Sequence, residues 1–491
     1  MADLSGVPAG TPVVVGVRTV EMPVLAEGDR VIAVQATGEL LVVSRNDLEV
    51  AHDAVERASK AFRSLSEVGD EQISQFFHLF ADRLADHKVW ASIEDANQSD
   101  VDRARASGRA ITRLVATEKM RDAMTDGLIG WAKAPARRGE LIETREGPDW
   151  TVERRRAPLG VVAFVFEGRP NVFADGAGVL RGGNTSVMRI GSDALRTAEA
   201  VEANALAPAL EAAGLPEGAV TLIRSPSHGV AHALFTMREV RLAIARGSGR
   251  TTALLGAIAA QHGIPASLHG TGGAWMYVSE DAPPDVARNA IVASLDRKVC
   301  NTLNTIVVDR RRSHQQIPLV LDALSWRDAS FRLHVAVGSE HDIPEALWSK
   351  RITVRRAEGD TVEPQVDAIP VDELAREWEW DETPEVSLVC AGSEEEAIDL
   401  INRYSPRFVA SVITSDPERF ERFYERVDTP YVGDGFTRWV DGQWAWDRPE
   451  LGLSNWERGR ILSRSGILAG DDVFTVRDVF RDRSGEASQT R

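Results

Sequence analysis

The chain contains two cysteines, Cys300 and Cys390, and they stand in contrasting surroundings. Arg297 and Lys298 precede Cys300, and a polar Asn-Thr turn follows it. Nearby cations favour the thiolate, which is the form of cysteine that acts as a nucleophile. Cys390 lies instead in the apolar run 386–391, which is typical of a small buried hydrophobic residue. We therefore interpret Cys300 as a candidate nucleophile, and a purely structural cysteine is the alternative.

A glycine-containing turn, Arg246-Gly247-Ser248-Gly249, falls between a strand expected at 240–245 and a helix expected at 251–260. Glycines allow backbone N–H groups to approach a phosphate, and a helix N-terminus favours an anion. The turn is not the usual six-residue dinucleotide fingerprint, and a tight turn without a ligand is the alternative.

A second polar loop, Gly168-Arg169-Pro170-Asn171, follows the apolar run 160–166. Open α/β sheets bind ligands at the carboxyl ends of their strands, which is where this loop would lie. The amide of Asn171 could donate to a developing oxyanion. The alternative is that Asn171 caps the helix that follows it.

These residues need a scaffold, and the pattern from residue 158 onward predicts one. Apolar strand-like runs alternate with helical segments of moderate length, which indicates βαβ units and a doubly wound α/β sheet. The expected strands are 160–166, 185–188, 219–223 and 240–245, and the expected helices are 192–213, 228–235 and 251–260.

The region before residue 158 follows a different pattern. Short strands are expected at 13–15, 30–34 and 39–43, and apolar residues at helical spacing predict helices over 48–62 and 73–84. Further helix is expected to about Lys133, with breaks around Gly108 and Gly127. Residues 138–157 predict a hairpin, either an ordinary surface hairpin or an arm that reaches a neighbouring subunit.

Composition excludes several classes of protein. A chain of 491 residues is expected to form two or more domains, and 43% hydrophobic with 27% charged residues is typical of a soluble enzyme. A net charge of −17 argues against nucleic acid as a partner. Arg154–Arg156 and Arg310–Arg312 are expected to be solvated loop ends. We expect a cytoplasmic protein without a membrane partner, and loose termini at 1–10 and 482–491.

Several segments together carry a resemblance to a known family. They are Pro158-Leu159-Gly160-Val161-Val162, Glu167-Gly168-Arg169-Pro170-Asn171-Val172, Asn184-Thr185-Ser186-Val187-Met188-Arg189-Ile190-Gly191-Ser192, Glu211 to Pro216, Arg246-Gly247, Val299-Cys300-Asn301, Ile401 to Tyr404, Thr437-Arg438 with Asp441-Gly442, and Leu451-Gly452-Leu453-Ser454. In this order, from about Leu48 to Phe480, the chain resembles the aldehyde dehydrogenase superfamily. Within it, the chain is most similar to the gamma-glutamyl phosphate reductases of proline biosynthesis.

The resemblance implies an aldehyde dehydrogenase-like α/β fold in three parts. A Rossmann-type domain for a nicotinamide dinucleotide is expected at 44–138 and 157–269, and a catalytic domain with the nucleophilic cysteine at 270–460. Segments 138–157 and 472–480 are expected to form an oligomerisation arm, in a homodimer or homotetramer.

The resemblance also implies a reaction, the reduction of an acyl phosphate to an aldehyde. Cys300 would attack the acyl carbon and expel phosphate, and the thioester would accept hydride from NADPH, with NADH as the alternative. Asn171 and the backbone N–H of Cys300 would hold the oxyanion. A kinase would supply the small-molecule acyl phosphate.

The resemblance assigns the remaining site residues as well. Arg189 and Ser192 would lie near the adenosine ribose and its phosphate, and Arg246, Gly247, Ser248 and Gly249 beside the pyrophosphate. Arg169, Asn301 and Arg438 would contact the substrate. For Arg438 a surface salt bridge is the alternative.

The chain departs from its relatives at three places. Leu268-His269-Gly270-Thr271-Gly272-Gly273 lacks the glutamate that hydrolytic aldehyde dehydrogenases use to activate water, which favours reduction. His269 is either a base or a polar loop residue. Segment 404–410 loses the reductases' histidine and carboxylate, and Trp444, Trp446, Asp447 and Arg448 replace an aromatic-glycine stretch. Two alternatives therefore stay open: a different amino-acid acyl phosphate or acyl thioester as substrate, or a catalytically weak scaffold for a partner kinase or carrier.

Overall fold

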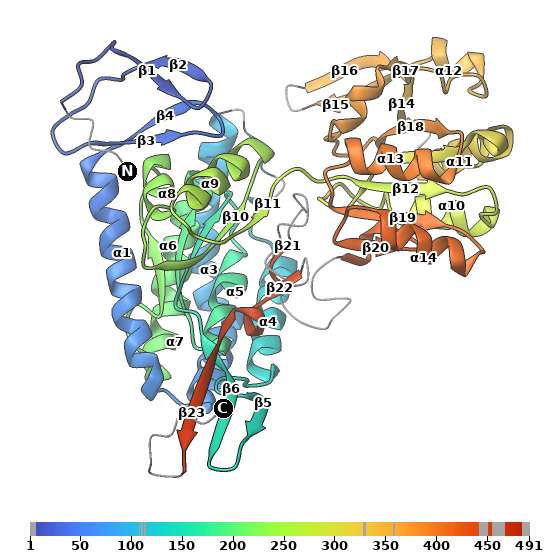
Figure 1. The fold of residues 1–491 in the computed structure, drawn as a ribbon. Helices are drawn as coiled ribbons and strands as arrows, with labels where there is room; N and C mark the ends of the chain where they lie inside the picture. Colours follow the sequence, from blue (N-terminus) through green and yellow to red (C-terminus); the bar gives the residue numbers. More distant parts are fainter. Residues whose placement is uncertain are drawn as a thin grey trace. The chain divides into compact units, whose positions relative to one another are not determined.

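The computed structural model describes residues 6–107, 109, 111, 114–327, 330–356, 359–440, 450–453 and 467–483. The chain divides into two compact units (Figure 1). Of the described residues, the first unit holds 6–268, 450–453 and 467–483, and the second holds 269–440.

The first unit is built on a five-stranded sheet with the order β11-β10-β7-β8-β9. Its strands are β7 (Val161–Phe166), β8 (Thr185–Ile190), β9 (Val220–Ile223), β10 (Val240–Arg246) and β11 (Ala266–His269). β10, β7, β8 and β9 pair in parallel, as the strand-helix alternation predicts. The chain order reverses between β10 and β7, and such a reversal leaves a crevice at the carboxyl ends of the two strands.

Helices cover this sheet on both faces. They are α1 (Arg45–Ser64), α2 (Asp70–Ala85), α3 (His87–Ala106), α4 (Glu118–Lys133), α5 (Val172–Ala177), α6 (Leu195–Val201), α7 (Ala207–Ala212), α8 (His228–Leu234) and α9 (Gly249–Gln261). Successive side chains of a strand point to opposite faces, so β7 contributes side chains to two hydrophobic cores. Phe164 packs in the core that contains the aromatic residues of α2, whereas Ala163 and Val165 pack in the core that contains α1, α8 and α9.

Two predicted helical details differ from the structure. The helix expected over 192–213 is divided into α6 and α7 by a π-helical turn at Glu202–Leu206. The break expected around Gly127 is wrong, because α4 runs through that residue. Gly127 is buried in the middle of α4, and α4 packs along α2, so tertiary packing overrides the poor helix propensity of glycine.

Two small hairpins precede α1. They are formed by β1 (Pro12–Val15) with β2 (Arg18–Glu21) and by β3 (Arg30–Val34) with β4 (Glu39–Val43). The N–H of Gly10 donates to Met22 O at 2.8 Å, so this part of the predicted loose N-terminus is fixed to the chain. Residues 1–5 and 484–491 lie outside the described residues.

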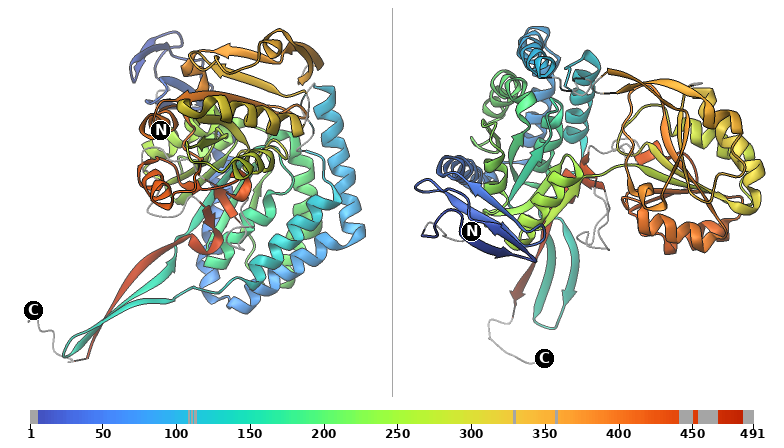
Figure 2. Two further views of the ribbon diagram at one scale, coloured as in Figure 1. Left: turned by 90° about the vertical axis from the view of Figure 1, so that its right-hand side faces the viewer. Right: turned by 90° about the horizontal axis from the view of Figure 1, so that it is seen from above.

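The predicted hairpin extends into a three-stranded antiparallel sheet that projects from the body of the first unit (Figure 2). Its strands are β5 (Leu141–Glu146), β6 (Trp150–Pro158) and β23 (Phe474–Asp482). Arg154 pairs in register with Asp478, and its Nε donates to Asp478 Oδ1 at 2.9 Å. The prediction that Arg154–Arg156 form a loop end is therefore wrong, because these arginines lie within β6 and each forms an ion pair with an acidic residue.

The second unit contains a seven-stranded parallel sheet with the order β17-β14-β18-β13-β12-β19-β20. Its strands are β12 (Ala274–Val278), β13 (Leu303–Asp309), β14 (Arg332–Ala336), β17 (Val366–Ile369), β18 (Glu385–Ala391), β19 (Val409–Ile413) and β20 (Tyr431–Gly433). Its helices are α10 (Pro284–Ala293), α11 (Ser313–Arg327), α12 (Glu345–Ser349), α13 (Glu394–Tyr404) and α14 (Pro417–Arg426).

Two more strand pairs complete the fold. β15 (Arg351–Arg356) and β16 (Gly359–Pro364) form a hairpin in the second unit, and β21 (Glu450–Leu453) pairs with β22 (Ile467–Ala469) in the first. None of the helices in the described part of the chain is long and apolar enough to span a membrane.

Asn184 joins three segments at the root of the projecting sheet. Its Oδ1 accepts from the N–H groups of Leu159 and Gly160 at 2.7 and 3.0 Å. Its Nδ2 donates to Val179 O at 3.3 Å and to Val473 O at 2.7 Å. The side chain is fully buried, so its loss would leave several backbone groups without water or a partner.

We predict that Asn184→Ala destabilises the protein by about 3 kcal/mol, because at least two buried backbone groups lose their hydrogen bonds. Urea unfolding, followed by circular dichroism, measures the change. Asn204→Ala is the matched control, since Asn204 is only partly buried and makes one bond, to Ala200 O at 2.9 Å. Equal effects of the two substitutions would contradict the role given to Asn184.

Candidate active site

Cys300 lies in the second unit, on a tight turn between α10 and β13. The Thr302 side chain closes this turn: Val299 N donates to Thr302 Oγ1 at 2.8 Å, and Thr302 Oγ1 donates to Arg297 O at 2.6 Å. Cys300 is partly exposed, whereas Cys390 is buried in β18, where burial raises the pKa of its thiol. Of the two thiols, Cys300 is therefore the one that a substrate could reach.

A glycine loop packs directly against the backbone of Cys300. Gly273 N donates to Cys300 O at 2.7 Å, and Ala274 N donates to Thr302 O at 2.9 Å. A Cβ at Gly272 would lie 2.6 Å from Cys300 O and 2.7 Å from its Cα, so no larger residue fits there. This loop is the segment in which the sequence lacks the glutamate of the hydrolytic enzymes.

The 3-10 helix at Thr437–Val440 holds the other side of the turn. Thr437 Oγ1 donates to Asn301 O at 2.7 Å, and Arg438 donates to Asn301 Oδ1 and, at 2.8 Å, to Asp296 Oδ1. Arg438 and Asn301, two of the predicted substrate residues, are both buried. Arg438 thus makes the salt bridge considered as its alternative role, although at a buried position rather than on the surface.

The structure adds one residue that sequence reasoning missed. Glu377 Oε1 accepts from Lys298 Nζ at 2.7 Å, and its Oε2 accepts from Gly272 N at 2.6 Å. Glu377 lies 77 positions beyond Cys300 in an acidic and aromatic stretch with no recognisable motif, so the sequence offers no signal that brings it to the nucleophile.

His269, which the sequence analysis considers as a base, packs against an aromatic side chain. Its ring centroid lies 5.1 Å from that of Phe408, and Phe408 meets Tyr431 edge-on at 5.3 Å. Phe408 is fully buried and occupies the position where the motif of the reductases has histidine. Arg407 precedes it with φ of 53°, an uncommon conformation for a residue other than glycine.

In the first unit, the predicted cofactor residues gather at one edge of the parallel sheet. The loops after β7, β8 and β10 are joined where these strands end, since Glu167 N donates to Arg246 O and Gly191 N donates to Phe166 O, both at 3.0 Å. A Cβ at Gly191 would lie 2.6 Å from Gly168 N, so the two loops touch. This edge includes the crevice created by the reversal of strand order.

The turn after β10 can receive a phosphate. Ser248 caps the 13-residue helix α9 by accepting from Thr251 N at 3.3 Å, and nothing lies within 4 Å of the position that a Cβ of Gly247 would occupy. Beneath the turn, Arg246 Nη1 donates to Asp175 Oδ2 at 3.0 Å. An open glycine and a helix N-terminus at the carboxyl edge of the sheet fit the pyrophosphate of a dinucleotide.

Arg189 and Ser192, the other predicted cofactor residues of this unit, form hydrogen bonds with neighbouring loops and helices. Arg189 is buried and donates to Pro226 O at 2.9 Å, and burial lowers the pKa of its guanidinium. Ser192 begins a short 3-10 helix and accepts from Arg103 Nη2 at 2.9 Å through its carbonyl. Arg189 therefore fixes the loop between β9 and α8.

Asn171 stands at the N-cap position of α5, but its side chain makes no capping hydrogen bond. The side chain of Asn171 therefore does not cap the helix, which was the alternative role considered for it. Arg169 forms an ion pair with Glu167 in the same loop.

The structure brings the predicted residues together in two groups. Cys300, Asn301 and Arg438 form one group in the second unit. Arg169, Asn171, Arg189, Ser192 and Arg246–Gly249 line the carboxyl edge of the sheet in the first unit. Trp444, Trp446, Asp447 and Arg448 lie outside the described residues.

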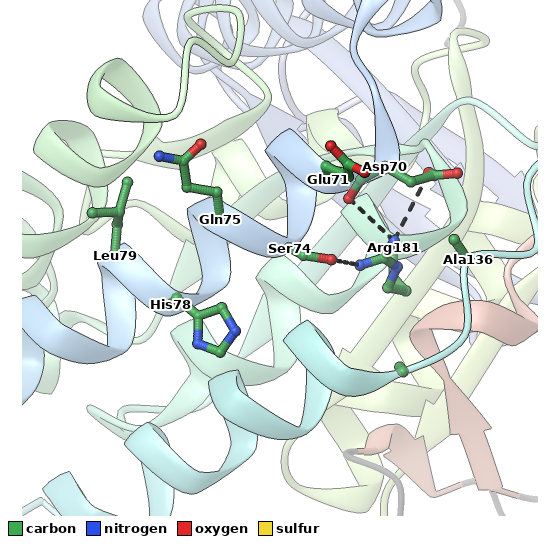
Figure 3. Close-up of a pocket in the computed structure, with 9 residues that line it drawn as sticks. Asp70, Glu71, Ser74, Gln75, His78, Leu79, Ala136 and Arg181 are labelled. Carbon is green, nitrogen blue, oxygen red and sulfur yellow. Dashed lines mark hydrogen bonds and ion pairs between the residues drawn. The ribbon is translucent and has the colours of Figure 1, made fainter.

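A pocket of about 580 Å³ lies in the first unit and includes none of the predicted site residues (Figure 3). Its lining residues are Asp70, Glu71, Ser74, Gln75, His78, Leu79, Ala134, Ala136 and Arg181. Arg181 Nη1 donates to Ser74 Oγ at 2.7 Å, and its Nη2 lies 3.8 Å from Asp70 Oδ1. Since the guanidinium of Arg181 is already engaged by Ser74 and Asp70, we assign the pocket no ligand.

Comparisons with known proteins agree with this fold. Residues 29–326 match the model of the aldehyde dehydrogenase family. Gamma-glutamyl phosphate reductase of Lachnospira eligens is 29% identical over 407 residues, which cover 81% of this chain and 91% of the relative. The corresponding reductase of Rhodospirillum rubrum is 29% identical over 403 residues, which cover 80% and 86%.

Solved structures share the fold. The gamma-glutamyl phosphate reductase of Thermotoga maritima matches with a TM-score of 0.77 at 22% identity, over 90% of this chain and 100% of the other. A propionaldehyde dehydrogenase of Rhodopseudomonas palustris, with bound propionyl-CoA, matches with a TM-score of 0.59 at 16% identity, over 87% and 93%.

Asp175 provides a pH-dependent test of the cofactor edge. Burial raises the pKa of its carboxyl from 3.8 to about 6, and Arg246 offsets only part of this effect. A raised native pKa stabilises the fold at low pH, and this contribution is lost as the pH rises through about 6. We therefore predict that the stability of the wild type relative to Asp175→Asn falls by about 2 kcal/mol between pH 4 and pH 7. Urea midpoints over this range measure the difference, and parallel curves would contradict the assignment.

Proposed function

Because the chain belongs to the aldehyde dehydrogenase family, we propose that it reduces gamma-glutamyl phosphate to glutamate-5-semialdehyde and phosphate, a step of proline biosynthesis. The observation that carries the proposal is the glycine loop against Cys300. Gly272 and Gly273 contact the backbone of Cys300, and residues 268–273 lack the glutamate with which the hydrolytic members of the family activate water. The similarity to gamma-glutamyl phosphate reductases over about four-fifths of the chain supports the choice of substrate.

In the proposed reaction the thiolate of Cys300 attacks the acyl carbon, and the bond from that carbon to the phosphate oxygen breaks. A reduced nicotinamide, when bound, would supply the hydride that converts the resulting thioester into the aldehyde, and the thiolate of Cys300 would then be free. Asn171 and the backbone N–H of Cys300 donate to the oxygen that carries the developing negative charge. Arg169, Asn301 and Arg438 orient the substrate, the last two by holding the turn beneath it.

The carboxyl edge of the first sheet would hold the cofactor, with Arg246, Gly247, Ser248 and Gly249 at the pyrophosphate and Arg189 and Ser192 near the adenosine ribose. An acidic residue near this ribose favours NAD, whereas arginine accommodates the 2′-phosphate of NADP. Asp193, beside Ser192, is ion-paired with Arg109, which supports NADPH as the reductant and leaves NADH as the alternative.

Assembly and pathway context are part of the proposal. The projecting sheet exposes four large apolar side chains, Leu141, Ile142, Val476 and Phe480, and a subunit contact in a homodimer or homotetramer would cover them. Acyl phosphates form by phosphoryl transfer to a carboxylate, so a kinase would supply the substrate, and we place both enzymes in the cytoplasm.

One observation favours a second candidate substrate. Phe408 replaces the histidine of the reductases' motif and is enclosed by His269 and Tyr431. If that histidine contacts the glutamyl group in the relatives, this chain would prefer a less polar acyl group. Reduction of another amino-acid acyl phosphate or acyl thioester is therefore the alternative.

The reverse reaction tests the proposal. Enzyme, glutamate-5-semialdehyde in its cyclised form, phosphate and NADP or NAD are mixed, and the reduced nicotinamide is followed by absorbance. We expect phosphate-dependent turnover that falls by at least about 10³-fold in Cys300→Ala, because the covalent step is lost. Cys390→Ala is the matched control and should keep its turnover.

Activity of Cys300→Ala near that of the wild type would remove Cys300 as the nucleophile. No turnover of the wild type, with Cys300 still alkylated rapidly, would favour another acyl substrate. No turnover together with an inert thiol would favour the scaffold.

A further inference from the structure

The carboxylate of Glu377 joins the two backbone segments that flank Cys300. One oxygen accepts from the ammonium of Lys298, two positions before the nucleophile, and the other accepts from the N–H of Gly272 in the glycine loop. The side chain of Lys298 is 5% exposed and that of Glu377 is 18% exposed. An ion pair so far removed from water is sensitive to the loss of either partner, since the remaining charge is then buried and uncompensated.

The carboxylate of Glu377, the backbone of Gly272 and the backbone of Cys300 are closely packed. A Cβ on Gly272 would lie 2.7 Å from Glu377 Oε1 as well as 2.7 Å from the Cα of Cys300. Gly273 N donates to Cys300 O at 2.7 Å, so the loop that Glu377 holds is itself bonded to the nucleophile's backbone. A displacement of the carboxylate is therefore passed to Cys300 through a single layer of contacts.

The segment that carries Glu377 is anchored on both sides. Asn304 of β13 donates to Arg376 O and accepts from Trp378 N, both at 2.9 Å. The indole of Trp378 stacks on His334 of β14 with centroids 3.6 Å apart, and its Nε1 donates to Ser387 Oγ of β18 at 2.8 Å. Three neighbouring strands of the parallel sheet thus fix the backbone from which Glu377 reaches the turn.

We propose that Glu377 is a positioning residue, which clamps the glycine loop to the Cys300 turn and balances the charge of Lys298. This inference rests on the proposed nucleophilic role of Cys300. Both carboxylate oxygens are engaged by donors, so the residue acts through the turn and not as a base. The clamp keeps the sulfur of Cys300 aligned with the acyl carbon that it attacks. Small displacements from this alignment lower the rate of the reaction strongly.

Three variants and a control test the clamp. Glu377→Ala removes both bonds. Glu377→Gln can still accept from Gly272 but leaves the ammonium of Lys298 unbalanced. The double variant Glu377→Gln with Lys298→Met keeps the amide acceptor and removes that charge. Glu379→Gln is the control, because Glu379 is 4.0 Å from Lys298 but is 68% exposed.

Two readouts are needed: kcat and KM in the phosphate-dependent reverse reaction, and the rate at which iodoacetamide alkylates Cys300. We expect kcat to fall about 30-fold in Glu377→Ala and about tenfold in Glu377→Gln, with KM changed less than about twofold. Alkylation should become about fivefold faster in both, since a looser turn beside an unbalanced cation favours the reactive thiolate. The double variant should recover kcat to within about threefold of the wild type.

Folded fractions from circular dichroism normalise each rate, so a loss of stability alone cannot imitate the expected pattern. Turnover of Glu377→Ala within twofold of the wild type, or a double variant no better than Glu377→Gln, would overturn the proposal. If the wild type does not turn over the glutamyl substrate, the alkylation rates still test the clamp. Unchanged alkylation in both single variants would then refute it independently of the substrate.

Discussion

The hydrogen bond from Gly273 N–H to Cys300 O is the contact on which the catalytic turn depends. It requires a loop without side chains, because a Cβ at Gly272 would overlap the backbone of Cys300. Thr302 from within the turn, Thr437 from the loop after β20 and Glu377 from the segment before β18 then hold the remaining sides. The glycines thus order the turn that carries Cys300, and the absence of a glutamate from residues 268–273 is a separate feature that favours reduction.

In the first unit, the main structural feature is a group of polar residues that lie together at one edge of the sheet. Parallel strands end at the same edge, so the loops after β7, β8 and β10 meet although they lie up to about eighty positions apart in the sequence. Alternate side chains of β7 enter two separate cores, which fixes the sheet from both faces. The residues proposed to bind the cofactor therefore lie on loops, and rigid strands set the spacing between them.

The site residues and the joining of segments 138–157 and 472–480 are predicted from the family resemblance. The parallel sheet and the hairpin at 138–157 are predicted from local patterns. The apolar run of β7 and the turn at Gly247 carry such signals. The burial of Arg438 and the position of Glu377 depend on contacts between distant segments, which one sequence does not reveal. At Gly127 a local pattern gave a wrong prediction. Glycine has a poor helix propensity, but Gly127 lies inside α4, and the packing of α4 against α2 keeps this segment helical.

The most direct measurement is a single turnover in the absence of phosphate. Enzyme, cyclised glutamate-5-semialdehyde and oxidised nicotinamide are mixed, quenched in acid and digested, and the peptide that contains Cys300 is weighed by mass spectrometry. The account predicts a burst of about one equivalent of reduced nicotinamide and a glutamyl thioester on Cys300, because hydride transfer precedes the phosphate step. A burst without an adduct on Cys300, or an adduct on another residue, would contradict it.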